Sequence, residues 1–239
     1  MIALEVLPDP EALAQRAADW LLDAATARGG VFAVALAGGS TPRALYQRLA
    51  QPPYRDAFPW ARTHVFFGDE RFVPHDDKDS NFRMANEALL SHVPIPAGNI
   101  HPVPTEGLDP EAAASAYQQD LLAFYGRGNL TQERPLFDVT LLGLGGDGHT
   151  ASLFPGGAAL GERRLWVAAV ADAKGLARIT LTYPALESSR RLAFLVSGKE
   201  KSAILARFRA GDRALPAAHV QPVGELWLFV DADAAQSAV

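Results

Sequence analysis

The chain has 239 residues, 49% of them hydrophobic, and its 22 Lys and Arg against 27 Asp and Glu give a formal net charge of -5. This charge argues against a surface that coats nucleic acid, and the absence of cysteine excludes disulfides, thiolate catalysis and Cys-ligated metals. No apolar run approaches the roughly 20 residues that span a bilayer, and the first residues show no secretion signal. We therefore expect a cytoplasmic protein with no nucleic-acid or membrane partner, folded as one domain over residues 1–239.

Amphipathic helices and apolar strands alternate along the chain. Asp9-Pro10-Glu11 predicts a helix start, because Asp is a favoured N-cap and Pro a favoured first helical residue, and Gly29-Gly30 predicts its end. The same start at Asp109-Pro110-Glu111 predicts a helix to about Tyr125. Such alternation is typical of an α/β fold, with a mostly parallel sheet and helices on both faces. The other predicted helices cover 42–50, 80–90 and 199–209, and the strands cover 31–37, 64–67, 136–142, 165–170, 178–183, 191–196 and 226–230.

Ligands in such sheets bind at the carboxyl ends of the strands. The first of these ends is followed by Gly38-Gly39-Ser40-Thr41-Pro42-Arg43. Two glycines, Ser-Thr and a helical Pro make a helix N-terminus with free backbone N–H groups, which is a ready anion site. The segment lacks the Gly-Lys-Ser/Thr of a nucleotide P-loop, so it suits a phosphate on a small molecule better. A simple helix cap is the alternative interpretation.

The second carboxyl end leads into a loop at 68–74, where Asp69, Glu70 and Arg71 are three consecutive charges. Such a run is either a solvated turn or a site, and its place at the end of a strand favours the site. His75 follows and is a candidate for the mouth of the cleft. We interpret the cluster of His75, Asp76, Asp77 and Asp79 as a solvated turn rather than a metal site.

The most unusual segment is 143–155, Gly-Leu-Gly-Gly-Asp-Gly-His-Thr-Ala-Ser-Leu-Phe-Pro, which directly follows the apolar run at 137–142. Its glycines allow the backbone to come close to a ligand, because no Cβ blocks the approach. His149 can take or give a proton near neutral pH, and Asp147 can orient its ring. This segment is the best candidate for the chemistry.

A nicotinamide oxidoreductase is an alternative, because Gly143, Gly145 and Gly148 match the G-x-G-x-x-G spacing of dinucleotide-binding loops. That loop should open a long helix and lead to a strand with an acidic end. Here Pro155 cuts the next segment short, and residues 156–164 are not strand-like. We therefore expect no nucleotide cofactor.

Four segments together resemble the glucosamine-6-phosphate isomerase/6-phosphogluconolactonase family, and within it the 6-phosphogluconolactonases. The resemblance covers nearly the whole chain and implies a modified Rossmann-type, deaminase/lactonase-like fold in a single 6-phosphogluconolactonase-like α/β domain. It also implies hydrolysis of 6-phospho-D-glucono-1,5-lactone to 6-phospho-D-gluconate, in the oxidative branch of the pentose phosphate pathway, with no cofactor and no metal. The segments are 37–42, 68–74, 80–82 and 143–155, extended by 178–182 and 196–201.

This reaction needs an activated water, a stabilised oxyanion and a protonated leaving alkoxide. By its match to the family, His149 is the expected general base, and Asp147 either orients it or contacts a sugar hydroxyl. Arg71 is the candidate for the carbonyl oxygen or the phosphate, because its guanidinium is a rigid, always-charged donor fork. The expected contacts of the sugar-phosphate lactone are Gly38, Gly39, Ser40, Thr41, Arg43, Asp69, Arg178 and Lys201, with Lys199 as a lesser candidate.

Two further alternatives share this kind of fold. In the deaminases of the family, Tyr typically stands where this chain has Arg71, and an acidic residue supports the His where this chain has Thr-Ala-Ser after His149. Both departures favour the lactonase over the deaminase. A non-catalytic sugar-phosphate sensor would usually carry a DNA-binding module, and the chain has no helix-turn-helix candidate or basic extension.

Overall fold

Six parallel strands form the main sheet of the computed structural model, which describes residues 2–236. All five residues of β2 are buried, as expected for a parallel strand covered on both faces. The prediction of a mostly parallel sheet is confirmed. In spatial order the strands are β1 (Ile2–Leu7), β9 (Glu225–Asp231), β8 (Ser189–Val196), β5 (Phe137–Leu142), β2 (Phe32–Leu36) and β3 (Thr63–Phe67).

The helices begin where the capping residues predict. Asp9, Ser80 and Asp109 each accept a hydrogen bond from the backbone N–H three residues further on. Three predicted helices differ in their bounds: the one predicted over 42–50 covers Ser40–Leu49, the one predicted over 80–90 ends at Ala88, and the one predicted over 199–209 opens with a separate 3₁₀ turn at Lys199–Lys201. The helices are α1 (Pro10–Ala27), α2 (Ser40–Leu49), α3 (Tyr54–Ala57), α4 (Asn81–Ala88), α5 (Pro110–Tyr125), α6 (Tyr183–Glu187), α7 (Ser202–Arg209) and α8 (Ala232–Ala235).

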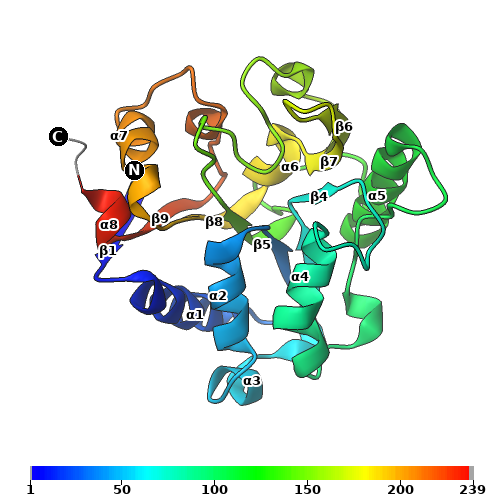
Figure 1. Cartoon of the computed structure of the whole chain (residues 1–239). Helices are drawn as coiled ribbons and strands as arrows, with labels where there is room; N and C mark the ends of the chain where they lie inside the picture. The colour runs from blue at the N-terminus through cyan, green and yellow to red at the C-terminus, as the bar shows by residue number, and fades with distance from the viewer. Residues whose placement is uncertain (1, 237–239) are drawn as a thin grey trace.

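Helices cover both faces of the main sheet (Figure 1). Trp20 of α1 packs edge-on against Phe229 of β9, with ring centroids 5.5 Å apart. Phe208 of α7 packs against Phe194 of β8, with centroids 5.0 Å apart. Phe194 pairs with Leu228 across the sheet, so these two side chains lie on the same face. Phe229 follows Leu228 in β9 and lies on the opposite face, because successive strand residues alternate. α1 and α7 therefore lie on opposite sides of the sheet.

A second, three-stranded sheet is antiparallel, in the order β4 (Asp69–Arg71), β7 (Ala177–Leu181) and β6 (Val167–Ala171). The prediction of a loop at 68–74 is wrong over 69–71, because these residues pair with Arg178 to Thr180 of β7. The strand is too short and too polar to show a period in the sequence. Its alternation turns Glu70 into the interior, away from the face that carries Asp69 and Arg71.

The order in which strands are added to the main sheet reverses between β2 and β5. From β2 the chain moves to β3 on one side, whereas β5, β8 and β9 follow one another on the other side. A crevice opens at the carboxyl ends of the strands at such a reversal. Within residues 2–236, no helix has both the length and the apolar composition needed to cross a bilayer.

Candidate active site

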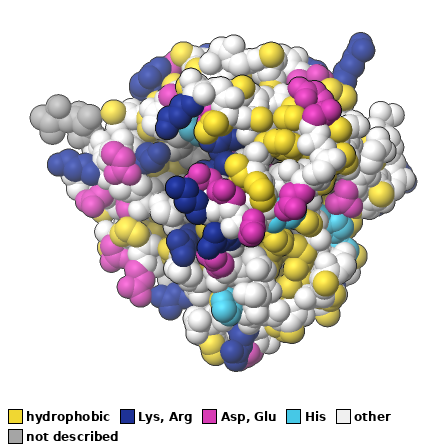
Figure 2. All heavy atoms as spheres, turned by 45° about the vertical axis from the view of Figure 1, so that its right-hand side comes forward, with side chains coloured by type: hydrophobic (Ala, Val, Ile, Leu, Met, Phe, Trp, Pro, Cys, Tyr) yellow, Lys and Arg dark blue, Asp and Glu magenta, His cyan; other side chains and the backbone are white. Residues whose placement is uncertain are grey.

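A cavity of about 320 Å³ lies at the carboxyl ends of β2, β5 and β8. This volume falls in the range of roughly 300–1,000 Å³ that is usual for small-molecule sites. One face of the molecule carries Lys and Arg side chains near its centre, with Asp and Glu side chains among them (Figure 2). The predicted site residues that line the cavity are Gly38, Gly39, Ser40, Thr41, Asp69, Arg71, His149 and Lys201.

The phosphate turn, residues Gly38 to Thr41, leads from β2 into α2. α2 has no side-chain cap, and its first intrahelical bond runs from the Arg43 N–H to the Gly39 carbonyl, at 3.1 Å. Within residues 2–236, the N–H groups of Ser40 and Thr41 have no hydrogen-bond partner. The N-terminus of α2 thus presents free donors to the cavity, where the helix dipole favours an anion.

Tyr46 fixes the start of this turn. Its hydroxyl accepts the N–H of Ala37 at 2.9 Å and donates to the carbonyl of the same residue at 2.8 Å. The side chain is fully buried, and burial raises the pKa of the hydroxyl well above its ordinary value. Tyr46 therefore stays protonated and satisfies both backbone groups at the end of β2.

β4 brings a half-buried acid, Asp69, and a buried acid, Glu70, to the cavity wall. The carboxylate of Asp69 accepts the hydroxyl of Ser152 at 2.6 Å. Glu70 is fully buried, and its carboxylate accepts the N–H groups of Arg71, Asn81 and Phe82 at 2.7 Å each. Burial raises the pKa of Glu70, and these three donors offset only part of that effect. Glu70 thereby ties β4 to the first turn of α4.

His149 and Asp147 form a pair at the end of the loop after β5. Nδ1 of His149 lies 2.5 Å from Oδ1 of Asp147, which also accepts the His149 backbone N–H at 3.0 Å. Partial burial raises the pKa of the Asp147 carboxyl, but these two hydrogen bonds together outweigh burial and hold the pKa below its usual value. The Phe154 ring packs against the imidazole at 4.9 Å. Nε2 of His149 has no hydrogen-bond partner in the described part of the chain.

Two cations reach the cavity from opposite sides. Lys201, just before α7, donates from Nζ to the Leu144 carbonyl at 2.8 Å. Arg71, on β4, donates from Nη1 to the Asp79 carbonyl at 2.5 Å. Each contact occupies only part of the donor set, because an ammonium has three N–H groups and a guanidinium five. Both side chains keep donors for a ligand.

Other predicted contacts lie outside the lining of this cavity. Arg178 is held by Asp172 at 2.8 Å, and its Nε is buried with no hydrogen-bond partner among residues 2–236. Arg43 and Lys199 are exposed and are not among the residues that line the cavity. His75 is likewise outside the lining, and its Nε2 contacts the Val103 carbonyl at 2.7 Å. Asp147 reaches the site only through His149.

Three polar side chains that line the cavity were given no role by the sequence, those of Asn81, Ser197 and Glu200. Asn81 belongs to a segment that the family resemblance includes, yet nothing in the residue pattern distinguishes it from an ordinary helix start. Its contacts lie on segments that are distant in the chain, so only the fold reveals them. Glu200 sits beside Lys201 in a turn that reads as a plain charged helix start.

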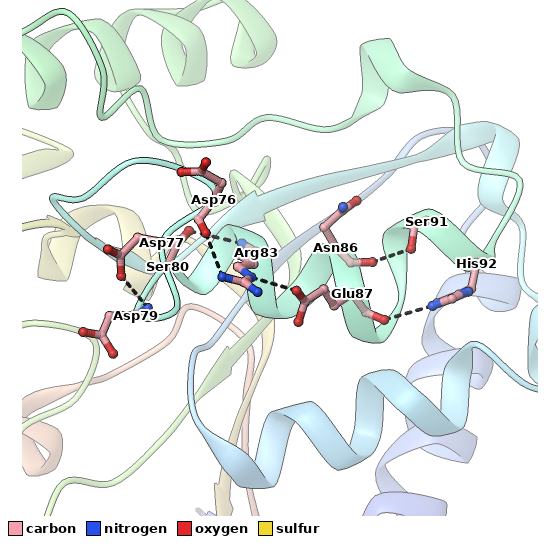
Figure 3. A network of polar contacts seen from close by, with 9 residues as sticks. All are labelled: Asp76, Asp77, Asp79, Ser80, Arg83, Asn86, Glu87, Ser91 and His92. Carbon is pink, nitrogen blue, oxygen red and sulfur yellow. Dashed lines mark hydrogen bonds and ion pairs between the residues drawn. The ribbon is translucent and has the colours of Figure 1, made fainter.

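The acidic segment at 76–79 is a solvated turn, as its sequence predicts (Figure 3). Asp77 accepts the backbone N–H of Asp79 at 2.8 Å. Arg83 donates to the Asp76 carbonyl and to Glu87, at 2.7 Å each. Among residues 2–236, no three His, Asp or Glu side chains are placed to hold one metal ion.

Comparison with known proteins adds a family to this geometry. A family model described as glucosamine-6-phosphate isomerases/6-phosphogluconolactonase matches residues 8–228. A 6-phosphogluconolactonase of Nostoc sp. is 44% identical over 97% of this chain and 96% of its own length. The crystal structure of a 6-phosphogluconolactonase from Thermotoga maritima has a TM-score of 0.82 at 32% identity, covering 97% of this chain and 100% of that one. A monomeric glucosamine-6-phosphate deaminase has a TM-score of 0.83 at 22% identity, covering 98% and 99% of the two chains, and shares the fold.

Proposed function

Because the chain belongs to the glucosamine-6-phosphate isomerase/6-phosphogluconolactonase family, we propose that it hydrolyses 6-phospho-D-glucono-1,5-lactone to 6-phospho-D-gluconate. This is the lactonase step of the oxidative pentose phosphate pathway. One observation carries the proposal: His149, Arg71 and the free N-terminus of α2 line the same cavity. A base, a cation and an anion site are what a phosphorylated lactone requires.

His149 activates the water in this proposal. Asp147 is held in its charged form, so the Nδ1 proton of His149 stays on the Asp147 side and Nε2 carries the free lone pair. Nε2 takes a proton from water as its oxygen bonds to the lactone carbonyl carbon. The resulting imidazolium then gives that proton to the ring oxygen as the carbon–oxygen bond of the lactone breaks. The products are the open-chain acid and a neutral imidazole, so His149 is restored.

Arg71 stabilises charge in the same proposal. A tetrahedral adduct places a negative charge on the former carbonyl oxygen, and a positioned donor with a full charge lowers the energy of that state. The guanidinium of Arg71 lines the cavity and keeps donors after its bond to Asp79. The phosphate is the other group that it can reach. The Arg71→Lys variant separates these two roles. A lower activity on both the phosphorylated and the unphosphorylated lactone assigns Arg71 to the oxyanion, and a lower activity on the phosphorylated lactone alone assigns it to the phosphate.

The phosphate binds at the other end of the cavity. We assign it to the backbone N–H groups and hydroxyls of Ser40 and Thr41, with the ammonium of Lys201 opposite. Gly38 and Gly39 allow the close approach. Arg43 and Arg178 lie outside the lining and are not part of this clamp. Cytoplasmic location, a single domain over 1–239 and the absence of nucleic-acid partners stay predictions.

The test is a lactonase assay on freshly generated 6-phosphogluconolactone, corrected for spontaneous hydrolysis. We expect the chain to accelerate ring opening strongly and to release no ammonia from glucosamine 6-phosphate. The second substrate matters because a glucosamine-6-phosphate deaminase shares this fold and Asp69 offers a carboxylate at the cavity wall. Ammonia release without lactone hydrolysis would assign the cavity to the deaminase reaction. Binding of both sugar phosphates without turnover of either would indicate a sensor.

A further inference from the structure

Asn81 joins two sides of the cavity. It is the first residue of α4, is 3% exposed and lines the cavity. Its Nδ2 donates to the backbone carbonyl of Asp69 at 2.9 Å and lies 3.4 Å from Oδ1 of the same residue. The amide also packs directly on the Cα of Gly38, where a Cβ would overlap it. One side chain therefore touches both the phosphate turn and the strand that carries Arg71.

The surroundings of Asn81 leave its amide little freedom. Its backbone N–H is bound by the buried carboxylate of Glu70, at 2.7 Å, and the same oxygen accepts the N–H of Arg71. On the far side, Asp69 accepts the hydroxyl of Ser152, three residues after His149. A continuous set of contacts thus runs from Gly38 through Asn81 and Asp69 to the loop of the proposed base.

We propose that Asn81 is a positioning residue that fixes the separation between the phosphate turn and the hydrolytic groups by holding Asp69 against Gly38. This inference rests on the proposed function. A lactone anchored by its phosphate presents its carbonyl carbon to His149 only when that separation is correct. A misplacement of about 1 Å can lower the rate by roughly 10²-fold. Asn81 acts through Asp69 and needs no contact with the reacting atoms.

Asn81→Asp is the sharpest test, because it keeps the shape of the side chain and replaces the Nδ2 donor by an oxygen. An ionised carboxylate there repels the Asp69 carbonyl and carboxylate, whereas a protonated carboxyl can donate to the Asp69 carbonyl again. The nearest charge, Asp69, raises the pKa of the introduced group. The other charged groups around position 81 are Glu70 on β4, Arg83 paired with Glu87 on α4, and Arg71, His149, Glu200 and Lys201 on the cavity.

Asn86→Asp is the matched control, since it makes the same chemical change on the same helix. Asn86 follows Ser80 by six residues, and both are labelled in Figure 3. In the described part of the chain the side-chain amide of Asn86 makes no hydrogen bond. Measurements are kcat/KM on freshly generated lactone from pH 8 to pH 5.5, each divided by the wild-type value at the same pH. This division removes the pH effects that the variant shares with the wild type.

For Asn81→Asp we expect a ratio of about 0.01–0.1 at pH 8, mostly from kcat, that rises as the pH falls. For Asn86→Asp we expect a ratio near 1 at every pH. Equal ratios for the two variants, or an Asn81→Asp ratio that does not change with pH in a folded protein, overturn the proposal. If the wild type itself does not hydrolyse the lactone, the proposed function fails, and this inference fails with it.

Gly38→Ala tests the contact between Gly38 and the Asn81 amide from the side of the phosphate turn. This test stays informative even if the Asn81→Asp variant does not fold. The added methyl displaces the Asn81 amide, so we expect a lower kcat. In the double variant Gly38→Ala/Asn81→Ala, the methyl group at position 38 enters the space that the amide leaves. The kcat of this double variant should therefore fall no further than that of the worse single variant. Losses that multiply across the two positions would show that Gly38 and Asn81 act independently, against the proposal.

Discussion

The Cα of Gly145 lies directly against the imidazole of His149, so that a Cβ at position 145 would overlap Nδ1 and Cε1 of the ring. Nδ1 is the atom that Asp147 holds, at 2.5 Å. The glycine therefore makes room for the ring orientation that leaves Nε2 free. In this loop the need for glycine comes from a close approach between backbone and side chain rather than from a left-handed backbone.

Gly145→Ala should lower kcat on the lactone by roughly 10–100-fold, because the methyl group forces the imidazole away from Asp147. KM should change little, since the phosphate turn is untouched. Gly146→Ala is the comparison, because a Cβ at 146 meets no atom within 4 Å. Steady-state kinetics on both variants check the prediction. Similar losses at 145 and 146 would show that contact with the ring is not what position 145 provides.

Lys201→Ala should raise KM for 6-phosphogluconolactone by about 10–100-fold, the cost of a lost hydrogen bond to a charged group. The KM for the unphosphorylated lactone should stay close to wild type, because that substrate brings no dianion. Lys199→Ala removes the same charge from an exposed position outside the cavity and serves as the control. A KM increase that is equal for the two substrates would remove Lys201 from the phosphate site.

Much of the fold is predictable from the sequence, for a physical reason. Buried parallel strands such as β2 are apolar throughout, and helix caps such as Asp9 and Asp109 are local hydrogen bonds, so both leave a local pattern. β4 leaves none, since three polar residues become a strand only by pairing with β7. The alternating β1 at the sheet edge is missed as well.

The candidate site divides in the same way. The turn at Gly38 to Thr41 and the segment around His149 are recognisable because their residue types are unusual for their positions. Asn81 is not, because its function depends on contacts with Gly38 and Asp69, which the fold alone brings near. Arg178 is the opposite case: its charge suggested a phosphate contact, and the structure places its guanidinium against Asp172, in the turn between β6 and β7.

The Asp172–Arg178 pair predicts a loss of stability in acid. The hydrogen bond from the Arg178 side chain, aided by the Leu176 N–H, lowers the pKa of Asp172 from 3.8 to about 2. Because the unfolded carboxyl binds a proton more readily, this contribution is present above about pH 4 and is lost as the pH falls toward 2.

Thermal unfolding between pH 5 and pH 2 checks this expectation. The midpoint of Asp172→Asn should be below that of the wild type at pH 5 and should approach it at pH 2. Asp23→Asn, which changes an exposed carboxyl on α1, serves as the control and should track the wild type throughout. If the unfolding midpoints of Asp172→Asn and the wild type differ by the same amount from pH 5 to pH 2, the Asp172–Arg178 pair does not titrate as described.

Tyr46→Phe should destabilise the fold by about 1–3 kcal/mol, because it leaves the N–H and carbonyl of Ala37 buried without a partner. For a chain of this size each kcal/mol lowers the unfolding midpoint by roughly 2–4 °C. Since Ala37 precedes the phosphate turn, KM for the phosphorylated lactone should rise as well. An unchanged midpoint would show that water replaces the hydroxyl at no cost.

Turnover of freshly generated 6-phosphogluconolactone by His149→Asn, corrected for spontaneous ring opening, tests the central claim most directly. Asn keeps a polar atom near the position of Nδ1 but cannot accept a proton near neutral pH. The account predicts a kcat lowered by about 10²–10⁴-fold, with KM close to that of the wild type because the phosphate turn is intact. A His149→Asn enzyme with wild-type kcat would contradict it.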